Sequence, residues 1–359
     1  MNILITGGAG FIGSHLIEKF IENQYKVIVI DNLLTGSKKN IKHFFENENF
    51  TFIDFDVQNH IEVAEDLDYV LHLASAASPK AYSEHPINTL KAGSIGTINT
   101  LGLAKAKNAK YLLTSTSEIY GDPLVSPQPE SYWGNVNPNG RRSMYDEAKR
   151  FAEAAVSSYN RIYDLDTRIL RLFNTYGPKM KVNDGRVVTN FISQAITGND
   201  ITIYGQGNQT RSFCYIDDTV SGILKAMESE KSEVFNIGNP NEITILQLAE
   251  KVIELTNSNS EIKFLKLPDD DPMQRKPDIT KANKELNWFP EVSLDLTIDV
   301  DSKFRINGAL IGSGNFTFAN NYYFETDKSQ LKVGGSSRLP NITGEIPLKL
   351  GAITLFDSY

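Results

Sequence analysis

A short apolar segment that leads directly into a glycine-rich loop constrains this chain more than any other feature. The segment NILIT, residues 2–6, has the composition of a buried strand, and GGAGFIG follows it at 7–13. A helix-spaced apolar pattern and a second apolar segment, KVIVID at 26–31, come next. Strand, glycine turn, helix and strand in this order predict a βαβ unit with parallel strands.

The same alternation continues along the chain. Further apolar strands are predicted at FTFIDFDV, DYVLHLAS, KYLLTSTS and DTRILRLF, with helices over 96–109 and 145–163. Strands that are apolar throughout indicate a parallel sheet covered on both faces. We therefore expect an α/β fold, a doubly wound parallel (Rossmann) sheet over residues 1–177, to which part of 212–240 returns.

The later parts of the chain differ in composition. Beyond residue 178 the predicted elements are mixed, and the loops are rich in Gly, Asn and Asp, which is typical of a smaller substrate-binding lobe. We assign residues 178–300 mainly to such a lobe. From Asp301 the chain is rich in Gly, Asn, Ser and Thr with scattered aromatics, which predicts a β-rich extension over 301–359.

Composition excludes several classes of function. The net charge of -8 argues against nucleic-acid binding, which needs a basic face. The apolar runs are too short to cross a bilayer, and the N-terminal residues lack a charged signal-peptide region, so we expect a cytoplasmic protein without membrane association. The single cysteine and the histidine spacing predict no metal site.

The glycine loop predicts a dinucleotide site. Gly7, Gly10 and Gly13 allow a tight turn and a close approach of pyrophosphate to the helix N-terminus. Asp31 ends the second strand, where an acid binds a ribose diol and repels a 2′-phosphate, which favours NAD over NADP. An ordinary loop with a solvated acid is the alternative. Further predicted NAD contacts are Phe11, Ile12, Asn32, Leu73 and, at the end of the third strand, Asp56 and Val57.

A tyrosine and a lysine one helical turn apart predict redox chemistry. Tyr145 and Lys149 in YDEAKR project from the same helix face, and we expect both to contact NAD as well. A lysine beside a tyrosine hydroxyl favours the phenolate, which can take a proton from a substrate alcohol as hydride leaves its carbon. Thr116, at a strand end, is the predicted partner of the substrate oxygen. The alternative is a surface Tyr and Lys on an amphipathic helix.

On these residues the sequence resembles the extended short-chain dehydrogenase/reductase family, and within it the UDP-glucuronate decarboxylase (UDP-xylose synthase) branch. The matching segments cover roughly the first 295 residues and include GGAGFIG, DNLLTG, HLAS, STSEIYGDP, YDEAKR, LRLFNTYGP, NDGRVVTNF, YGQGNQTRSFCYIDD and QRKPDI. The resemblance implies NAD, a UDP-sugar substrate and a homodimer.

The resemblance also implies a reaction. Related dehydratases carry an Asp–Glu pair after the strand-end Thr, whereas this chain has Ser117 and Glu118, as the decarboxylases do. Oxidation at C4 of UDP-glucuronate by NAD, with Tyr145 as base and Thr116 and Lys149 in support, makes a β-keto acid that loses CO₂. NADH then reduces C4 to give UDP-xylose. A Glu118 that only caps the next loop is the alternative.

Further site residues follow from the resemblance. Arg275 resembles the family's catalytic arginine near the carboxylate. The expected substrate-binding residues are Ser117, Glu118, Asn174, Arg186, Arg211, Tyr215 and Arg275.

Other functions stay open at this stage. They are a nucleotide-sugar 4-epimerase or 4,6-dehydratase, and a non-catalytic NAD-binding regulator. UDP-galacturonate also stays open as a substrate. The family ends with a helix soon after NWFPEVSL, and this chain begins one at LDLTIDV and then departs from the pattern.

Overall fold

The computed structural model describes residues 1–182, 184–266 and 274–294, together with four two-residue strands beyond them. The chain divides into two compact units. The first comprises Met1–Thr175, Gln209–Ile243 and the described part of 267–291, and the second comprises Tyr176–Asn208, Thr244–Lys266 and the described residues from Val292 on. The domain limits predicted from the sequence stay predictions, because a domain is a part of the chain that folds independently, and compactness alone does not test independent folding.

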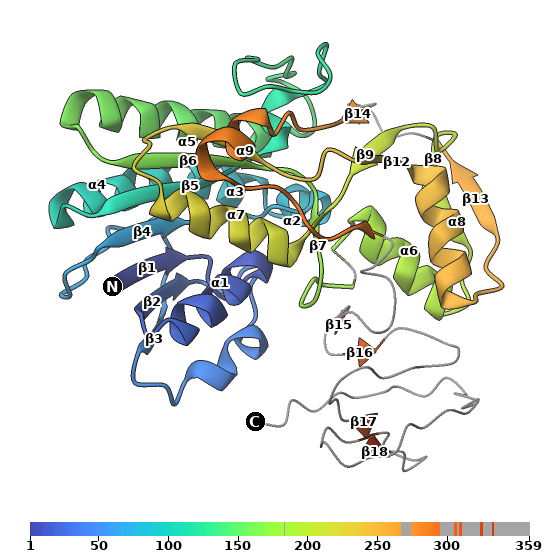
Figure 1. Cartoon of the computed structure of the whole chain (residues 1–359), viewed down its shortest axis with the longest axis horizontal. Helices are drawn as coiled ribbons and strands as arrows, with labels where there is room; N and C mark the ends of the chain where they lie inside the picture. The colour runs from blue at the N-terminus through green and yellow to red at the C-terminus, as the bar shows by residue number, and fades with distance from the viewer. Residues whose placement is uncertain are drawn as a thin grey trace. The chain divides into compact units, whose positions relative to one another are not determined.

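A seven-stranded sheet forms the centre of the first unit, with strand order β11-β6-β5-β4-β1-β2-β3 (Figure 1). Every adjacent pair is parallel, which confirms the predicted doubly wound α/β fold. The strands are β1 (Asn2–Thr6), β2 (Lys26–Asp31), β3 (Phe50–Asp54), β4 (Tyr69–His72), β5 (Lys110–Thr116), β6 (Thr167–Leu172) and β11 (Val234–Ile237). β5 and β6 are buried almost along their whole length, as their apolar runs predict.

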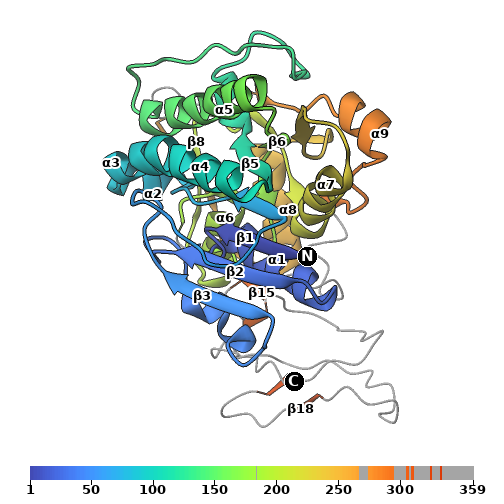
Figure 2. The same ribbon diagram turned by 90° about the vertical axis from the view of Figure 1, so that its left-hand side faces the viewer.

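Helices cover the sheet on both faces (Figures 1 and 2). α1 (Phe11–Glu22) packs against α7 (Ile216–Glu228), and α4 (Thr97–Lys107) packs against α5 (Ser143–Tyr163). Apolar side chains of the sheet, such as Leu4 and Leu113, join Leu101 of α4 and Val156 of α5 in one core cluster. The large buried area on both faces makes α5 a rigid support for the residues at its N-terminal end.

Shorter elements complete the first unit. α3 (Pro86–Lys91) and the π-helix η3 (Ala92–Gly96) pack against α5. β9 (Thr210–Ser212) pairs in parallel with β14 (Gln274–Arg275). The others are α2 (Pro79–Glu84), α9 (Thr280–Leu286), η1 (Lys38–Asn40), η2 (Lys42–Phe44), η4 (Ser117–Tyr120) and β10 (Cys214–Tyr215), while β7 (Thr175–Tyr176) and β12 (Glu242–Thr244) lie at the limits between the units.

The second unit is small. α6 (Val187–Ile196) packs against α8 (Ile245–Thr256), and β8 (Ile201–Tyr204) pairs in parallel with β13 (Ile262–Leu265). α8 begins with a capping box, in which Thr244 accepts from the Gln247 backbone N–H while the Gln247 side chain accepts from the Thr244 N–H. This reciprocal cap satisfies two of the amide groups that a helix start leaves without partners.

The predicted β-rich extension and the helix predicted to begin at LDLTIDV fall largely outside the described residues. Two antiparallel strand pairs are described there: β15 (Arg305–Ile306) with β16 (Ala309–Leu310), and β17 (Phe324–Glu325) with β18 (Lys332–Val333).

Candidate functional site

The glycine loop adopts a backbone that side chains would obstruct. Gly7 has φ +75, and a Cβ there would lie 2.8 Å from the backbone N of Ala74. A Cβ on Gly13 would lie 2.6 Å from the carbonyl oxygen of Gly7. Gly10 is the N-cap of α1, so the loop brings its backbone to the positive end of that helix. This arrangement fits a pyrophosphate group.

Asp31 lies at the carboxyl end of β2, beside this loop. Its carboxylate accepts hydrogen bonds from the backbone N–H groups of Ala9, at 3.0 Å, and Leu33, at 2.8 Å. A Cβ on Gly36 would lie 3.0 Å from both Asp31 oxygens. The acid is therefore fixed in orientation next to the glycine loop, as a residue that recognises a ribose diol requires.

The remaining predicted cofactor residues lie around the same strand ends. Phe11 and Ile12 open α1, and the N–H of Leu73 donates to the carbonyl of Thr6 at 3.1 Å. Asn32 donates to the carboxylate of Asp56 at 3.0 Å.

One detail of the prediction is wrong. β3 ends at Asp54, so Asp56 and Val57 lie in the loop after the strand rather than at its end. An Asx-type turn accounts for the early end, since the Asp56 carboxylate accepts from the backbone N–H of Gln58 at 2.9 Å.

Tyr145 and Lys149 occupy the first two turns of α5 and are both buried. The Lys149 ammonium donates to the carbonyl of Thr114 on β5 at 2.7 Å, and burial lowers the pKa of Lys149 to about 8. The ring of Tyr145 stacks on Tyr82, with centroids 5.2 Å apart. Thr116 ends β5, and its hydroxyl accepts from the backbone N–H of Glu118 at 3.2 Å. Threonine, tyrosine and lysine thus all lie where α5 packs on β5 and η4.

Glu118 is the centre of a buried ionic cluster. Arg275 donates to its two carboxylate oxygens at 2.5 and 2.9 Å, and to the Ser117 hydroxyl at 3.1 Å. Arg142 donates to the same carboxylate. Burial by itself would raise the pKa of Glu118, but the charges of Arg275 and Arg142 outweigh it and lower that pKa to about 2. Glu118 is therefore a carboxylate at every physiological pH.

The cap of η4 is Thr116, not Glu118. The Thr116 hydroxyl accepts from the backbone N–H of Glu118 in η4, whereas the Glu118 side chain binds Arg142 and Arg275. The two arginine contacts of the Glu118 carboxylate favour a role in the site over the alternative in which Glu118 only caps the next loop.

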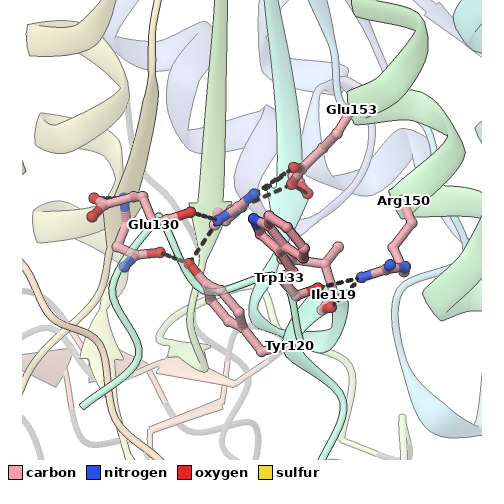
Figure 3. Close-up of polar contacts among 9 residues, drawn as sticks. Ile119, Tyr120, Glu130, Trp133, Arg150 and Glu153 are labelled. Atoms are coloured by element: carbon pink, nitrogen blue, oxygen red, sulfur yellow. Dashed lines mark hydrogen bonds and ion pairs between the residues drawn. The ribbon is translucent and has the colours of Figure 1, made fainter. Parts of the chain in front are cut away.

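Two further arginines fix the backbone around Glu118 (Figure 3). Arg150 donates to the carbonyls of Ile119, at 3.0 Å, and Trp133, at 2.8 Å. Arg171 binds Glu153 of α5 and donates to the Tyr120 hydroxyl at 2.9 Å. The residues that follow Glu118 are thus tied to α5 and β6, and this limits the movement of its carboxylate.

The predicted UDP contacts are distributed over both units. Asn174 follows β6, Tyr215 is the buried N-cap of α7, and the Arg211 guanidinium donates to the carbonyl of Thr210 at 2.9 Å. Arg211 is near enough to Glu118 to help lower its pKa. Arg186 belongs to the second unit, where it precedes α6 and pairs with Asp184 at 3.4 Å.

Sequence reasoning missed three residues of this cluster: Tyr82, Arg142 and Asp146. Arg142 is the N-cap of α5 and precedes Tyr145 by three residues. A residue three positions before Tyr145 lies on the same helix face, and this spacing could have identified Arg142 as a site residue. Asp146 is buried, and within the described residues its Oδ1 has no hydrogen-bond partner. Burial, followed by the nearby charge of Glu118, raises the pKa of Asp146 to about 7.

No group of His, Cys, Asp and Glu side chains in the described part of the chain has the arrangement of a metal site. Among the described helices, none combines the length and the apolar composition needed to cross a membrane.

Comparison with known proteins agrees with this geometry. The model of the NAD dependent epimerase/dehydratase family matches residues 3–238. UDP-glucuronic acid decarboxylase 5 of Arabidopsis thaliana is 54% identical over 295 residues, which are 82% of this chain and 86% of that protein. UDP-glucuronic acid decarboxylase 1 of Xenopus tropicalis is 50% identical over 82% of this chain and 69% of that protein.

Solved structures share the fold. UDP-glucose 4-epimerase of Thermotoga maritima, solved with UDP-glucose, has a TM-score of 0.77 and 34% identity over 83% of this chain and 98% of its own. UDP-glucuronic acid 4-epimerase of Bacillus cereus, solved with UDP-glucuronic acid and NAD, has a TM-score of 0.74 and 30% identity over 83% of this chain and 97% of its own. The chain belongs to the NAD dependent epimerase/dehydratase family and, within it, to the UDP-glucuronic acid decarboxylases.

Proposed function

We propose that this protein is an NAD-dependent enzyme that converts UDP-glucuronate to UDP-xylose and CO₂ without net oxidation. The observation that carries the proposal is the cluster of Ser117, Glu118 and Arg275 beside the buried Tyr145–Lys149 pair. A dehydratase needs a proton-donating acid after the strand-end threonine, and Ser117 at that position has no such acidity. The identity to decarboxylases over most of the chain supports the same activity.

The glycine loop and Asp31 fit NAD. Gly7 and Gly13 allow the tight packing of the loop that brings its backbone to the start of α1, where a pyrophosphate binds, and the fixed Asp31 carboxylate accepts from a ribose diol. Bound NAD supplies the hydride acceptor at the first step and the hydride donor at the last. Phe11, Ile12, Asn32, Leu73, Asp56 and Val57 complete the proposed set, together with Tyr145 and Lys149.

Residues of the chain transfer the C4 hydroxyl proton and stabilise the negative charge that develops on O4. Lys149, charged below about pH 8, stabilises the Tyr145 phenolate, which takes the proton from the C4 hydroxyl and becomes a neutral phenol. The C4 ketone then makes the substrate a β-keto acid, so the electrons released with CO₂ pass to O4. Tyr145 and Thr116 donate hydrogen bonds to that oxygen, where fixed donors lower the barrier most effectively.

The Glu118–Arg275 ion pair suits decarboxylation. A free arginine would bind the substrate carboxylate strongly and stabilise the ground state, which opposes loss of CO₂. Glu118 already neutralises Arg275 through two contacts, so Arg275 can orient the sugar without holding the carboxylate tightly. We assign Asn174, Arg186, Arg211 and Tyr215 to the UDP group, since arginines bind phosphate in a bidentate manner.

One experiment tests the function. Purified protein is incubated with UDP-glucuronate and NAD, and the products are identified by mass spectrometry and proton NMR. The expected products are UDP-xylose and CO₂ without net accumulation of NADH. UDP-galacturonate as the product would instead identify a 4-epimerase, the activity named for the Bacillus cereus structure. Absence of any turnover with bound NAD would identify a non-catalytic member of the family.

We further propose a homodimer that works in the cytoplasm without membrane or nucleic-acid partners. α3, η3, α4 and α5 present apolar side chains to solvent, namely Ile87, Leu90, Ile95, Ile98 and Phe151. An exposed apolar surface of this kind favours self-association. Sedimentation analysis of the wild type and of Phe151→Glu tests the dimer, and cell fractionation tests the location.

A further inference from the structure

The proposed reaction consumes one proton that the Tyr145 cycle cannot supply. Tyr145 takes a proton from the C4 hydroxyl during oxidation and returns it when C4 is reduced. Tyr145 therefore supplies no net proton over the whole reaction. Loss of CO₂ leaves an electron pair on C5, and a C5–H bond must then form. The site therefore needs a second acid, and this requirement rests on the proposed function.

Glu118 is unsuited to be that acid. It is bound by Arg275 and Arg142, each of which favours its ionised form. A carboxylate in two ion pairs has no proton to give. The ion pairs hold Glu118 as a fixed negative charge beside the substrate.

Asp146 has the opposite environment in the same cluster. Its side chain is 7% exposed, its Oδ1 is buried without a hydrogen-bond partner, and no ion pair to it is found among the described residues. The groups whose charges act on Asp146 come from four elements and are Tyr82 of α2, Glu118 of η4, Arg142 and Glu147 at the start of α5, and Arg275 of β14. The negative charge of Glu118 raises the pKa of Asp146 by more than the charge of either arginine lowers it.

A structural role at the helix start accounts poorly for Asp146. An acid in the first turn stabilises a helix when it is ionised and accepts from free backbone N–H groups. Within the described segments, no side chain caps the start of α5, and the Oδ1 atom of Asp146 makes no such bond. Burial and the charge of Glu118 raise the pKa of Asp146 to about 7, which keeps a large neutral fraction at physiological pH.

We propose that Asp146 in its neutral form is the acid that protonates C5 after CO₂ has left. The electron pair of the C4–C5 enolate takes the Asp146 proton and forms the C5–H bond, and C4 becomes a ketone again. Asp146 becomes a carboxylate and regains a proton from solvent before the next turnover. No oxidant or reductant is consumed in this step.

The Asp146→Asn variant separates this step from the earlier ones. Asn keeps the shape of the side chain and has no proton of comparable acidity. In a single turnover with UDP-glucuronate, we expect CO₂ release and NADH formation at the wild-type rate. UDP-xylose formation should fall by about 10² or more, and NADH should persist with a released 4-keto-pentose nucleotide.

A matched control variant and two contradicting results complete the Asp146→Asn experiment. Glu147→Gln changes the adjacent helix carboxylate, which is 38% exposed, and should leave all three rates unchanged. Equal losses of CO₂ release and UDP-xylose formation in Asp146→Asn would overturn the assignment, because Asp146 would then act before decarboxylation. A wild type that releases no CO₂ from UDP-glucuronate would instead refute the proposed function.

The wild type offers a second test that does not depend on folding of a variant. A raised pKa means that the acid form is present below about pH 7 and is lost above it. The ratio of released 4-keto nucleotide to UDP-xylose should therefore rise as the pH increases from 6 to 9. A ratio that stays constant over this range would also overturn the proposal.

Discussion

Arg275 and Glu118, 157 positions apart in the chain, form a two-point ion pair in which the guanidinium nitrogens meet both carboxylate oxygens at 2.5 and 2.9 Å. The pair joins β14 to η4 at the end of the central strand β5. The charges of the two groups oppose each other, and in the proposed reaction this lets Arg275 orient the sugar without holding the substrate carboxylate tightly. Arg142 adds one further positive charge to the same carboxylate.

Replacing Glu118 by Gln should reduce kcat by about 10² or more while the fold is kept. Two arginines then lose their partner and bind the substrate carboxylate in the ground state, so KM should stay constant or fall. Steady-state kinetics with UDP-glucuronate measure both constants. A lower melting temperature with unchanged turnover per folded molecule would show that Glu118 acts only on stability.

The Glu118 carboxylate also makes a pH-dependent contribution to stability. Its pKa is lowered from 4.5 to about 2 in the folded protein, so its stabilisation is present above about pH 4.5 and is lost as the pH falls toward 2. Urea unfolding of the wild type and Glu118→Gln between pH 2.5 and 6 measures this. The wild type should lose more stability than the variant over that range, and parallel curves would contradict the assignment.

Replacing Tyr145 by Phe should lower turnover by about 10² or more, because the base for oxidation at C4 is removed. NAD binding should survive, since the glycine loop is unchanged. Tyr163→Phe is the matched control, as Tyr163 lies at the other end of α5 and is 50% exposed. Turnover near the wild-type value in Tyr145→Phe would exclude Tyr145 as the base.

Replacing Asp31 by Ala should weaken NAD binding about tenfold or more and reduce the preference for NAD over NADP. The carboxylate that accepts from the ribose and repels a 2′-phosphate is lost. Asp54→Ala is the control, because Asp54 is the partner of Asp31 in the sheet register and is itself exposed. Dissociation constants for both nucleotides give the result, and an unchanged ratio would show that Asp31 does not select the cofactor.

Truncation after Val300 should leave NAD binding and decarboxylation largely intact. All the proposed site residues lie at or before Arg275. The aromatic residues of the tail, from Phe304 to Phe324, are numerous and would need burial somewhere, so folding must be measured along with activity. Melting temperature and turnover of the two chains are compared, and a truncated protein that aggregates would make the tail part of the core.

Local interactions allowed the sequence by itself to determine the glycine loop, the strands before and after it, and the placement of Tyr145 and Lys149 on one helix face. A glycine turn, an apolar strand and an i,i+4 spacing each depend on neighbours in the chain. The apolar runs also predicted a parallel sheet, because strands buried on both faces leave no polar alternation.

Only the tertiary structure decided the charge state of the site. The pairing of Arg275 with Glu118 and the approach of Arg142 join segments far apart in sequence. Folding also buries Asp146, whose Oδ1 has no hydrogen-bond partner in the part of the chain that the structure describes. A carboxylate's proton affinity depends on which charges surround it and on how much water remains, and neither is local. Glu118 and Asp146 are chemically alike in the sequence, and folding gives them pKa values of about 2 and about 7.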